Sequence, residues 1–140
     1  MKSPPAGARV LVVEDAAILA RIYSCALSAA GYLVDTASDG AEGFERLLGC
    51  SYDVVVTDLG MPRLNGLDLL QEVRRRRPEV PVVMVSGDLD PRTYEMARDM
   101  GMVRYLRKPM TMDQLARAVD NALMVGMARS RMAAARRATE

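Results

Sequence analysis

Five polar side chains in this 140-residue sequence are of types that could do chemistry together. They are the acidic pair Glu14 and Asp15, then Asp58, Ser86 and Lys108, and each stands at or just beyond the end of a short apolar run. Carboxylates without histidine or cysteine favour Mg²⁺ or a similar hard cation. A carboxylate beside a cation, an ammonium group and a hydroxyl could accept a phosphoryl group, since the cation and the ammonium group would offset its negative charge.

The apolar runs predict the elements that must position these groups. The runs occupy residues 10–13, 32–34, 54–56, 82–85 and 103–106. Three are rich in valine, which favours strands, and three show no polar alternation, which is typical of parallel strands covered on both faces. With helical patterns between them, they predict an α/β fold, a single doubly wound parallel sheet of five strand–helix units. The carboxyl ends of such strands meet at one edge, where a site is expected.

Apolar spacing and capping residues predict where the helices begin and which faces they bury. In the first helix the predicted core face consists of Ile18, Ile22, Cys25, Ala26 and Ala29. Ser38 is the expected N-cap of the second helix, and Asp90 followed by Pro91 should begin the fourth. Residues 111–114, Thr-Met-Asp-Gln, predict a capping box at the start of the last helix.

Composition limits the class of protein. Half of the residues are hydrophobic and 26% are charged, as in a globular domain, and no apolar run approaches the length of a membrane span. A formal net charge of +1 argues against nucleic acid as a partner. The absence of histidine excludes Ser-His-Asp and Cys-His catalysis and imidazole-ligated zinc. Cys25 and Cys50 form no CxxC motif, which indicates a reduced, cytoplasmic protein.

The motifs at the strand ends resemble those of response-regulator receiver domains, the CheY-like family of two-component signalling. The matching segments are residues 12–15, 58–66, 85–87 and 105–109, and the resemblance covers roughly residues 8–125. It implies the flavodoxin-like strand order 2-1-3-4-5. It also implies a single-domain switch rather than an enzyme that turns over an external substrate.

The resemblance assigns a role to each group of the site. Asp58 would accept a phosphoryl group from a phosphohistidine of a sensor kinase or a histidine phosphotransfer protein. Glu14, Asp15 and Asp58 would hold Mg²⁺ together with the backbone carbonyl of Gly60. Lys108 would pair with the phosphoryl oxygens. In the family, the positions of Gly60 and of Asp88, two residues after Ser86, flank the path of the water that removes the phosphoryl group. The resemblance therefore leaves the lifetime of the phosphoryl group open.

The same resemblance implies how the switch works. Ser86 would move toward the phosphoryl group and Tyr105 would change rotamer with it, while a cis peptide bond before Pro109 would present the lysine. The surface expected to change consists of the fourth helix, the fifth strand and the fifth helix. That surface would bind an unknown downstream protein, pass on phosphate in a relay or form a homodimer. The alternative is an adaptor module of the same fold that works without phosphorylation.

Domain boundaries follow from the ends of these patterns. Residues 1–8 are expected to be a flexible leader, residues 9–125 the receiver domain, and residues 126–140 a basic helical or disordered tail. In that tail four arginines against one glutamate give a net charge of +3. Enzymes of similar fold match this sequence poorly. A haloacid-dehalogenase-type phosphatase needs a second acidic residue two positions after its nucleophile, where this sequence has Gly60, and a P-loop nucleotidase needs a GxxxxGK[ST] loop, which is absent.

Overall fold

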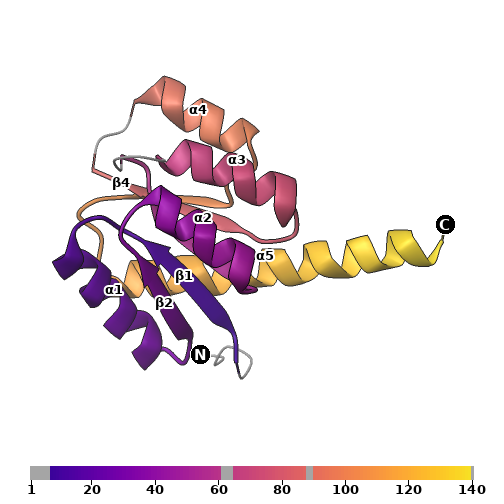
Figure 1. Cartoon of the computed structure of the whole chain (residues 1–140), viewed down its shortest axis with the longest axis horizontal. Coiled ribbons are helices and arrows are strands. Elements are labelled where there is room, and N and C mark those ends of the chain that lie inside the picture. The colour runs from indigo at the N-terminus through magenta and orange to yellow at the C-terminus, as the bar shows by residue number, and fades with distance from the viewer. Residues whose placement is uncertain (1–6, 61–64, 88–89, 140) are drawn as a thin grey trace.

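The computed structural model describes residues 7–60, 65–87 and 90–139, and within them five strands alternate with five helices (Figure 1). The sheet is parallel throughout, in the order β2-β1-β3-β4-β5, so the predicted fold and strand order are confirmed. The strands are β1 (Arg9–Val13), β2 (Leu33–Ala37), β3 (Val54–Asp58), β4 (Val82–Ser86) and β5 (Arg104–Arg107). The helices are α1 (Ala17–Ala29), α2 (Gly40–Gly49), α3 (Gly66–Arg76), α4 (Pro91–Asp99) and α5 (Met112–Ala138).

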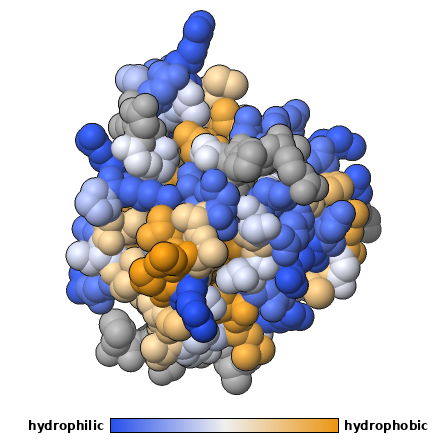
Figure 2. All heavy atoms as spheres, turned by 60° about the vertical axis from the view of Figure 1, so that its left-hand side comes forward, coloured by the Kyte–Doolittle hydropathy of each residue, from blue (hydrophilic) through white to orange (hydrophobic). Residues whose placement is uncertain are grey.

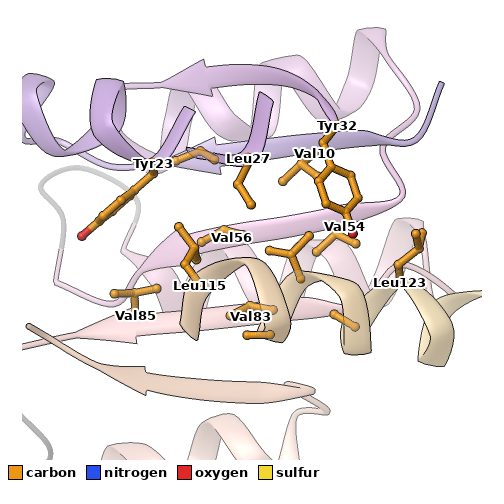
Figure 3. Close-up of a cluster of buried hydrophobic side chains, with 14 of the residues drawn as sticks. Val10, Tyr23, Leu27, Tyr32, Val54, Val56, Val83, Val85, Leu115 and Leu123 are labelled. Carbon is orange, nitrogen blue, oxygen red and sulfur yellow. The ribbon is translucent and has the colours of Figure 1, made fainter. Parts of the chain in front are cut away.

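Helices cover both faces of the sheet. Helices α1 and α5 lie on one face, and α2, α3 and α4 lie on the other (Figure 1). Val10 and Val12 of β1 point into the first layer, whereas Leu11 and Val13 point into the second. Figure 3 shows the first layer, in which strand valines meet leucines of the two helices. Because every central strand is buried on both sides, its sequence is a continuous apolar run.

The predicted core face of α1 is wrong. Ile18 is 75% exposed, Ile22 is 45% exposed and Cys25 is exposed, whereas the buried residues of α1 are Ala20, Tyr23 and Leu27. Apolar residues lie on more than one side of this helix, so periodicity alone could not choose between the two stripes. Tyr23 and Leu27 fill the layer between α1 and α5, which leaves the isoleucines in solvent.

Capping was predicted correctly at two helices and one residue early at a third. Asp90 caps α4, and the capping box at α5 is formed. At α2 the N-cap is Asp39, whose carboxylate accepts from the Glu42 amide at 2.8 Å, and not Ser38. Ser38 instead donates its hydroxyl to the Glu42 carboxylate at 2.7 Å. Both polar residues therefore serve the same helix start, but only the second has the N-cap position.

The last helix runs past the sheet. Helix α5 has 27 residues and continues through Ala138, and its C-terminal part projects from the edge of the molecule (Figure 1). Gly126 marks the point where it leaves the domain, because a Cβ there would lie 2.7 Å from Pro81 Cδ. Among the described helices, none combines the length and apolarity needed to cross a membrane.

We expect a Tyr52→Phe substitution to lower the free energy of unfolding at pH 7 by about 1 kcal/mol. The Tyr52 hydroxyl donates to Asp35 Oδ2 at 2.7 Å, and this hydrogen bond, followed by the charge of Arg9, lowers the pKa of Asp35. A lowered carboxyl pKa stabilises the fold above the ordinary value of 3.8, and that stabilisation disappears as the pH falls through the folded pKa. Urea unfolding of both proteins at pH 7 and pH 3 tests this, and an equal difference at both pH values would contradict it.

Candidate functional site

The carboxyl ends of the strands bring the predicted site residues to one edge of the sheet. Asp58 is the last residue of β3, whose neighbours in the sheet are β1 and β4. Glu14 and Asp15 directly follow β1, and Lys108 directly follows β5. Residues separated by up to 94 positions in the sequence therefore meet, as parallel topology predicts.

Lys108 joins two of the three carboxylates. Its Nζ lies 2.7 Å from Glu14 Oε1 and 2.8 Å from Asp58 Oδ2. Backbone amides hold the remaining oxygens, since Ala16 donates to Glu14 Oε2 at 3.1 Å and Gly60 donates to Asp58 Oδ1 at 3.0 Å. The orientation of both carboxylates is thus set by one ammonium group and two amides.

Burial makes this cluster electrostatically sensitive. Glu14 is only 2% exposed, and burial is the main reason that its pKa is raised, against the hydrogen bond from Lys108. Burial alone would lower the pKa of Lys108, but the hydrogen bonds to Asp58 and Glu14 outweigh it and raise that pKa. The lysine is therefore a permanent positive charge at neutral pH, placed between two groups that repel each other.

The three carboxylates also fit a divalent cation. Glu14, Asp15 and Asp58 each offer an oxygen, and these oxygens lie within 4.8 Å of one another. Hard oxygen ligands with Asp15 open to solvent suit Mg²⁺, which retains several waters when it binds. The acidic cluster is consistent with the Mg²⁺ site that the sequence predicts. The amide of Gly60 lies at this site, whereas coordination by its carbonyl stays a prediction.

Ser86 and Tyr105 lie beside the cluster and contact each other. Ser86 is the last residue of β4, is 7% exposed, and accepts two hydrogen bonds at its carbonyl. One comes from the Lys108 amide at 2.8 Å and the other from the Tyr105 hydroxyl at 3.3 Å. The Tyr105 ring meets Tyr94 of α4 edge to face, with centroids 5.7 Å apart. A movement of Ser86 would therefore displace Tyr105 of β5 and, through it, Tyr94 of α4.

The Lys108–Pro109 peptide bond is cis, as predicted. Residues 61–64 of one sequence motif, the neighbouring Asp88 and residues 1–6 of the predicted leader lie outside the described residues.

Gly66 belongs to the structural support of the site, which the sequence did not reveal because Asn-Gly is an ordinary turn signal. Its amide donates to the Leu59 carbonyl at 3.0 Å. A Cβ on Gly66 would lie 2.5 Å from the Asp58 carbonyl oxygen and 2.8 Å from Leu59 Cα. Since both are backbone atoms, only glycine lets α3 begin this close to the end of β3.

A Gly66→Ala substitution should therefore shift the backbone that carries Asp58. We expect it to lower the free energy of unfolding by about 2 kcal/mol, as overpacking of a tight contact does. The matched control is Gly49→Ala, because a Cβ at Gly49 meets nothing within 4 Å. Chemical unfolding of the three proteins measures the effect, and similar stabilities for the two variants would contradict the close contact.

Comparison with known proteins agrees with this fold and site. The family model described as "Response regulator receiver domain" matches residues 10–120. The curated protein DltR of Streptococcus agalactiae, a transcriptional regulatory protein, is 36% identical over 109 residues. The response regulator ArlR of Staphylococcus aureus is 31% identical over 107 residues. Each alignment covers 76% of this chain and 48% of the relative, so the chain spans about half the length of these curated relatives.

Solved structures match over most of both chains. A response regulator receiver domain protein from Clostridium thermocellum superposes with a TM-score of 0.79 at 35% identity, covering 83% of this chain and 94% of that one. The chemotaxis protein CheY4 of Vibrio cholerae superposes with a TM-score of 0.79 at 28% identity, covering 84% and 99%. Fold and site together define a phospho-accepting signalling switch rather than an enzyme. The chain belongs to the response regulator receiver domain family of two-component signalling.

Proposed function

We propose that this receiver domain is phosphorylated on Asp58 in the presence of Mg²⁺. The observation that carries the proposal is the contact of Lys108 with both Asp58 and Glu14 at the acidic edge of the sheet. The donor would be a phosphohistidine of a sensor kinase or of a histidine phosphotransfer protein. Cys25 and Cys50 are free thiols, which fits action in the reducing cytoplasm.

The transfer step follows from the groups around Asp58. One carboxylate oxygen attacks the phosphorus, the phosphorus–nitrogen bond of the donor breaks, and its electron pair stays on the leaving imidazole. Lys108 pairs with the negative charge of the transferred group, while the Gly60 amide keeps the carboxylate in position. Glu14, Asp15 and Asp58 would hold Mg²⁺, which would supply further positive charge against the phosphoryl group. Histidine is absent from these 140 residues, so the phosphohistidine must lie outside them.

The new charge at Asp58 would then drive the switch. Hydrogen bonds from Ser86 and Lys108 to phosphoryl oxygens would each contribute roughly 1.5–3 kcal/mol. Shifting a two-state equilibrium from mostly off to mostly on requires about 5.5 kcal/mol, so two such bonds are of the right order. Tyr105, which contacts the Ser86 carbonyl and Tyr94, would transmit the change to the surface formed by α4, β5 and α5.

Intact-mass measurement after incubation with acetyl phosphate tests the proposal. We expect one added phosphoryl group in the presence of Mg²⁺ and none with EDTA. If no adduct forms, NMR spectra with beryllofluoride distinguish rapid loss of phosphate from the alternative function. A receiver that loses its phosphate quickly should still bind the analogue and shift Ser86 and Tyr105, whereas a phosphorylation-independent adaptor should not.

The exposed isoleucines of α1 support a docking surface for the phosphodonor. Ile18 and Ile22 lie in solvent, four residues apart on the helix that begins just after Asp15. Ile22 also lines a surface pocket of about 510 Å³ together with Lys108 and Met110. The face that carries α1 shows a gathering of apolar side chains (Figure 2). An apolar patch beside a reactive carboxylate suits a protein that must bring its own histidine there.

An Ile18→Asp substitution should therefore slow transfer from the phosphodonor protein by roughly tenfold or more, the cost of a charge in an apolar contact. Acetyl phosphate needs no such contact, so phosphorylation by acetyl phosphate should be unchanged. Met132→Asp provides a control, because this methionine is also exposed but lies on the projecting part of α5. Equal losses with the protein donor and with acetyl phosphate would contradict a docking role for Ile18.

A further inference from the structure

Two arginines come together at the end of α3 that lies farthest from Asp58. Arg74 belongs to the last turn of α3, and Arg129 lies on α5 one turn beyond Gly126. Gly126 brings the two segments together, because its Cβ position lies against Pro81 and 3.5 Å from the Glu79 carbonyl. The C-terminal part of α5 therefore runs directly past the chain that follows α3.

The Arg74 side chain is fixed by the fold. Its Nη1 donates to the Pro78 carbonyl at 2.9 Å. Its Cδ lies 3.2 Å from the Cβ position of Gly101, whose positive φ turns the chain after α4 against the arginine. An arginine held at both its stem and its head loses little further freedom when it binds a ligand.

Three donor atoms of this pair have no hydrogen-bond partner among the described residues. Nε and Nη2 of Arg74 and Nη1 of Arg129 are buried and have no hydrogen-bond partner in the described part of the chain. Nε carries one N–H and each Nη carries two, and buried N–H groups normally have acceptors. Burial, followed by the charge of Arg129, lowers the pKa of Arg74 to about 10, so Arg74 is still cationic at neutral pH.

Nearby acids do not neutralise the pair. Glu72 is 3.5 Å from Arg75 and 3.4 Å from Arg76, so its carboxylate is already shared by two other arginines. Glu79 raises the pKa of Arg74 through its charge but forms no ion pair with it among the described contacts. Both arginines therefore keep unused donors, and they are near enough for the charge of Arg129 to lower the pKa of Arg74.

We propose that Arg74 and Arg129 form a binding site for a phosphate-type oxyanion that links α3 to the projecting part of α5. A tetrahedral oxyanion has enough acceptor oxygens for N–H groups on two guanidinium forks. Each residue as a whole is only half-buried, although these three donor atoms are themselves buried. The site lies at the opposite end of α3 from the Asp58 cluster and does not depend on phosphorylation.

The test uses the full chain with EDTA, so that no metal mediates phosphate binding at the acidic cluster. Arginine Nε–H NMR signals are followed while inorganic phosphate replaces chloride at constant ionic strength. We expect the Arg74 signal to shift and saturate. Arg129→Gln should weaken phosphate binding by roughly tenfold, because it removes a charged fork. Arg129→Lys, which keeps the charge but lacks the fork, should weaken it less.

Arg136→Gln is the matched control, because Arg136 is exposed on the same helix and should bind phosphate like the original chain. The same titration with ADP in place of phosphate shows whether the site binds a phosphoester or only the free ion. In chloride, Arg129→Gln should also raise the melting temperature, because the repulsion between Arg74 and Arg129 is removed. A shift that does not saturate, equal weakening by Arg136→Gln, or acetate binding as tightly as phosphate would overturn the proposal.

Discussion

Asp58→Asn is expected to abolish the Mg²⁺-dependent phosphoryl adduct completely while leaving the fold intact. An amide oxygen is a far weaker nucleophile than a carboxylate oxygen, so no acyl phosphate should form. The substitution is isosteric, and its amide oxygen can still accept from the Gly60 amide. Intact mass after acetyl phosphate treatment gives the result directly, and circular dichroism checks the fold.

Asp15→Asn separates the nucleophile from the metal site. Asp15 belongs to the same acidic cluster but is exposed and should act only through Mg²⁺. Phosphorylation of this variant should be slowed and should recover in part at high Mg²⁺ concentration.

Adduct formation by Asp58→Asn at the rate of the original chain would show that another residue accepts the phosphoryl group, and the proposed function would be wrong in its central step.

The positions of these groups could be predicted because they depend on topology. Once apolar runs define parallel strands, Asp58 and the residues after β1 and β5 must share an edge, whatever their side chains do. The contacts of Lys108 with two carboxylates follow from the same edge and from opposite charge. Local rules that use few residues, such as the capping box at Thr111, were equally predictable.

Features that depend on packing between distant segments could not be predicted. The buried stripe of α1 is decided by what α5 places opposite Tyr23 and Leu27. The need for glycine at Gly66 arises from the Asp58 carbonyl, and at Gly126 from Pro81. In each case the sequence shows a residue of ambiguous meaning, and the reason for it lies on another element.

Lys108→Met should destabilise the protein in the absence of Mg²⁺ by about 3 kcal/mol, the low end of what breaking a buried ion pair costs. The low end applies because Lys108 is 21% exposed, while its partners Glu14 and Asp58 are 2% and 12% exposed at their side chains. Without the ammonium group, the two carboxylates repel each other in a poorly hydrated place. Methionine keeps the length of the side chain, so the loss reports charge rather than volume.

Mg²⁺ should reverse most of this loss, because the cation replaces the missing positive charge between the same carboxylates. The Lys108→Met variant should therefore gain more stability from Mg²⁺ than the original chain does. Arg107→Gln is the control, since Arg107 is the exposed neighbour at the end of β5 and should change neither stability nor its Mg²⁺ dependence. Urea unfolding of the three proteins with Mg²⁺ and with EDTA measures both effects. If Mg²⁺ stabilised Lys108→Met no more than the control, the cation and the lysine would not act on the same carboxylates, and the metal site would have to lie elsewhere.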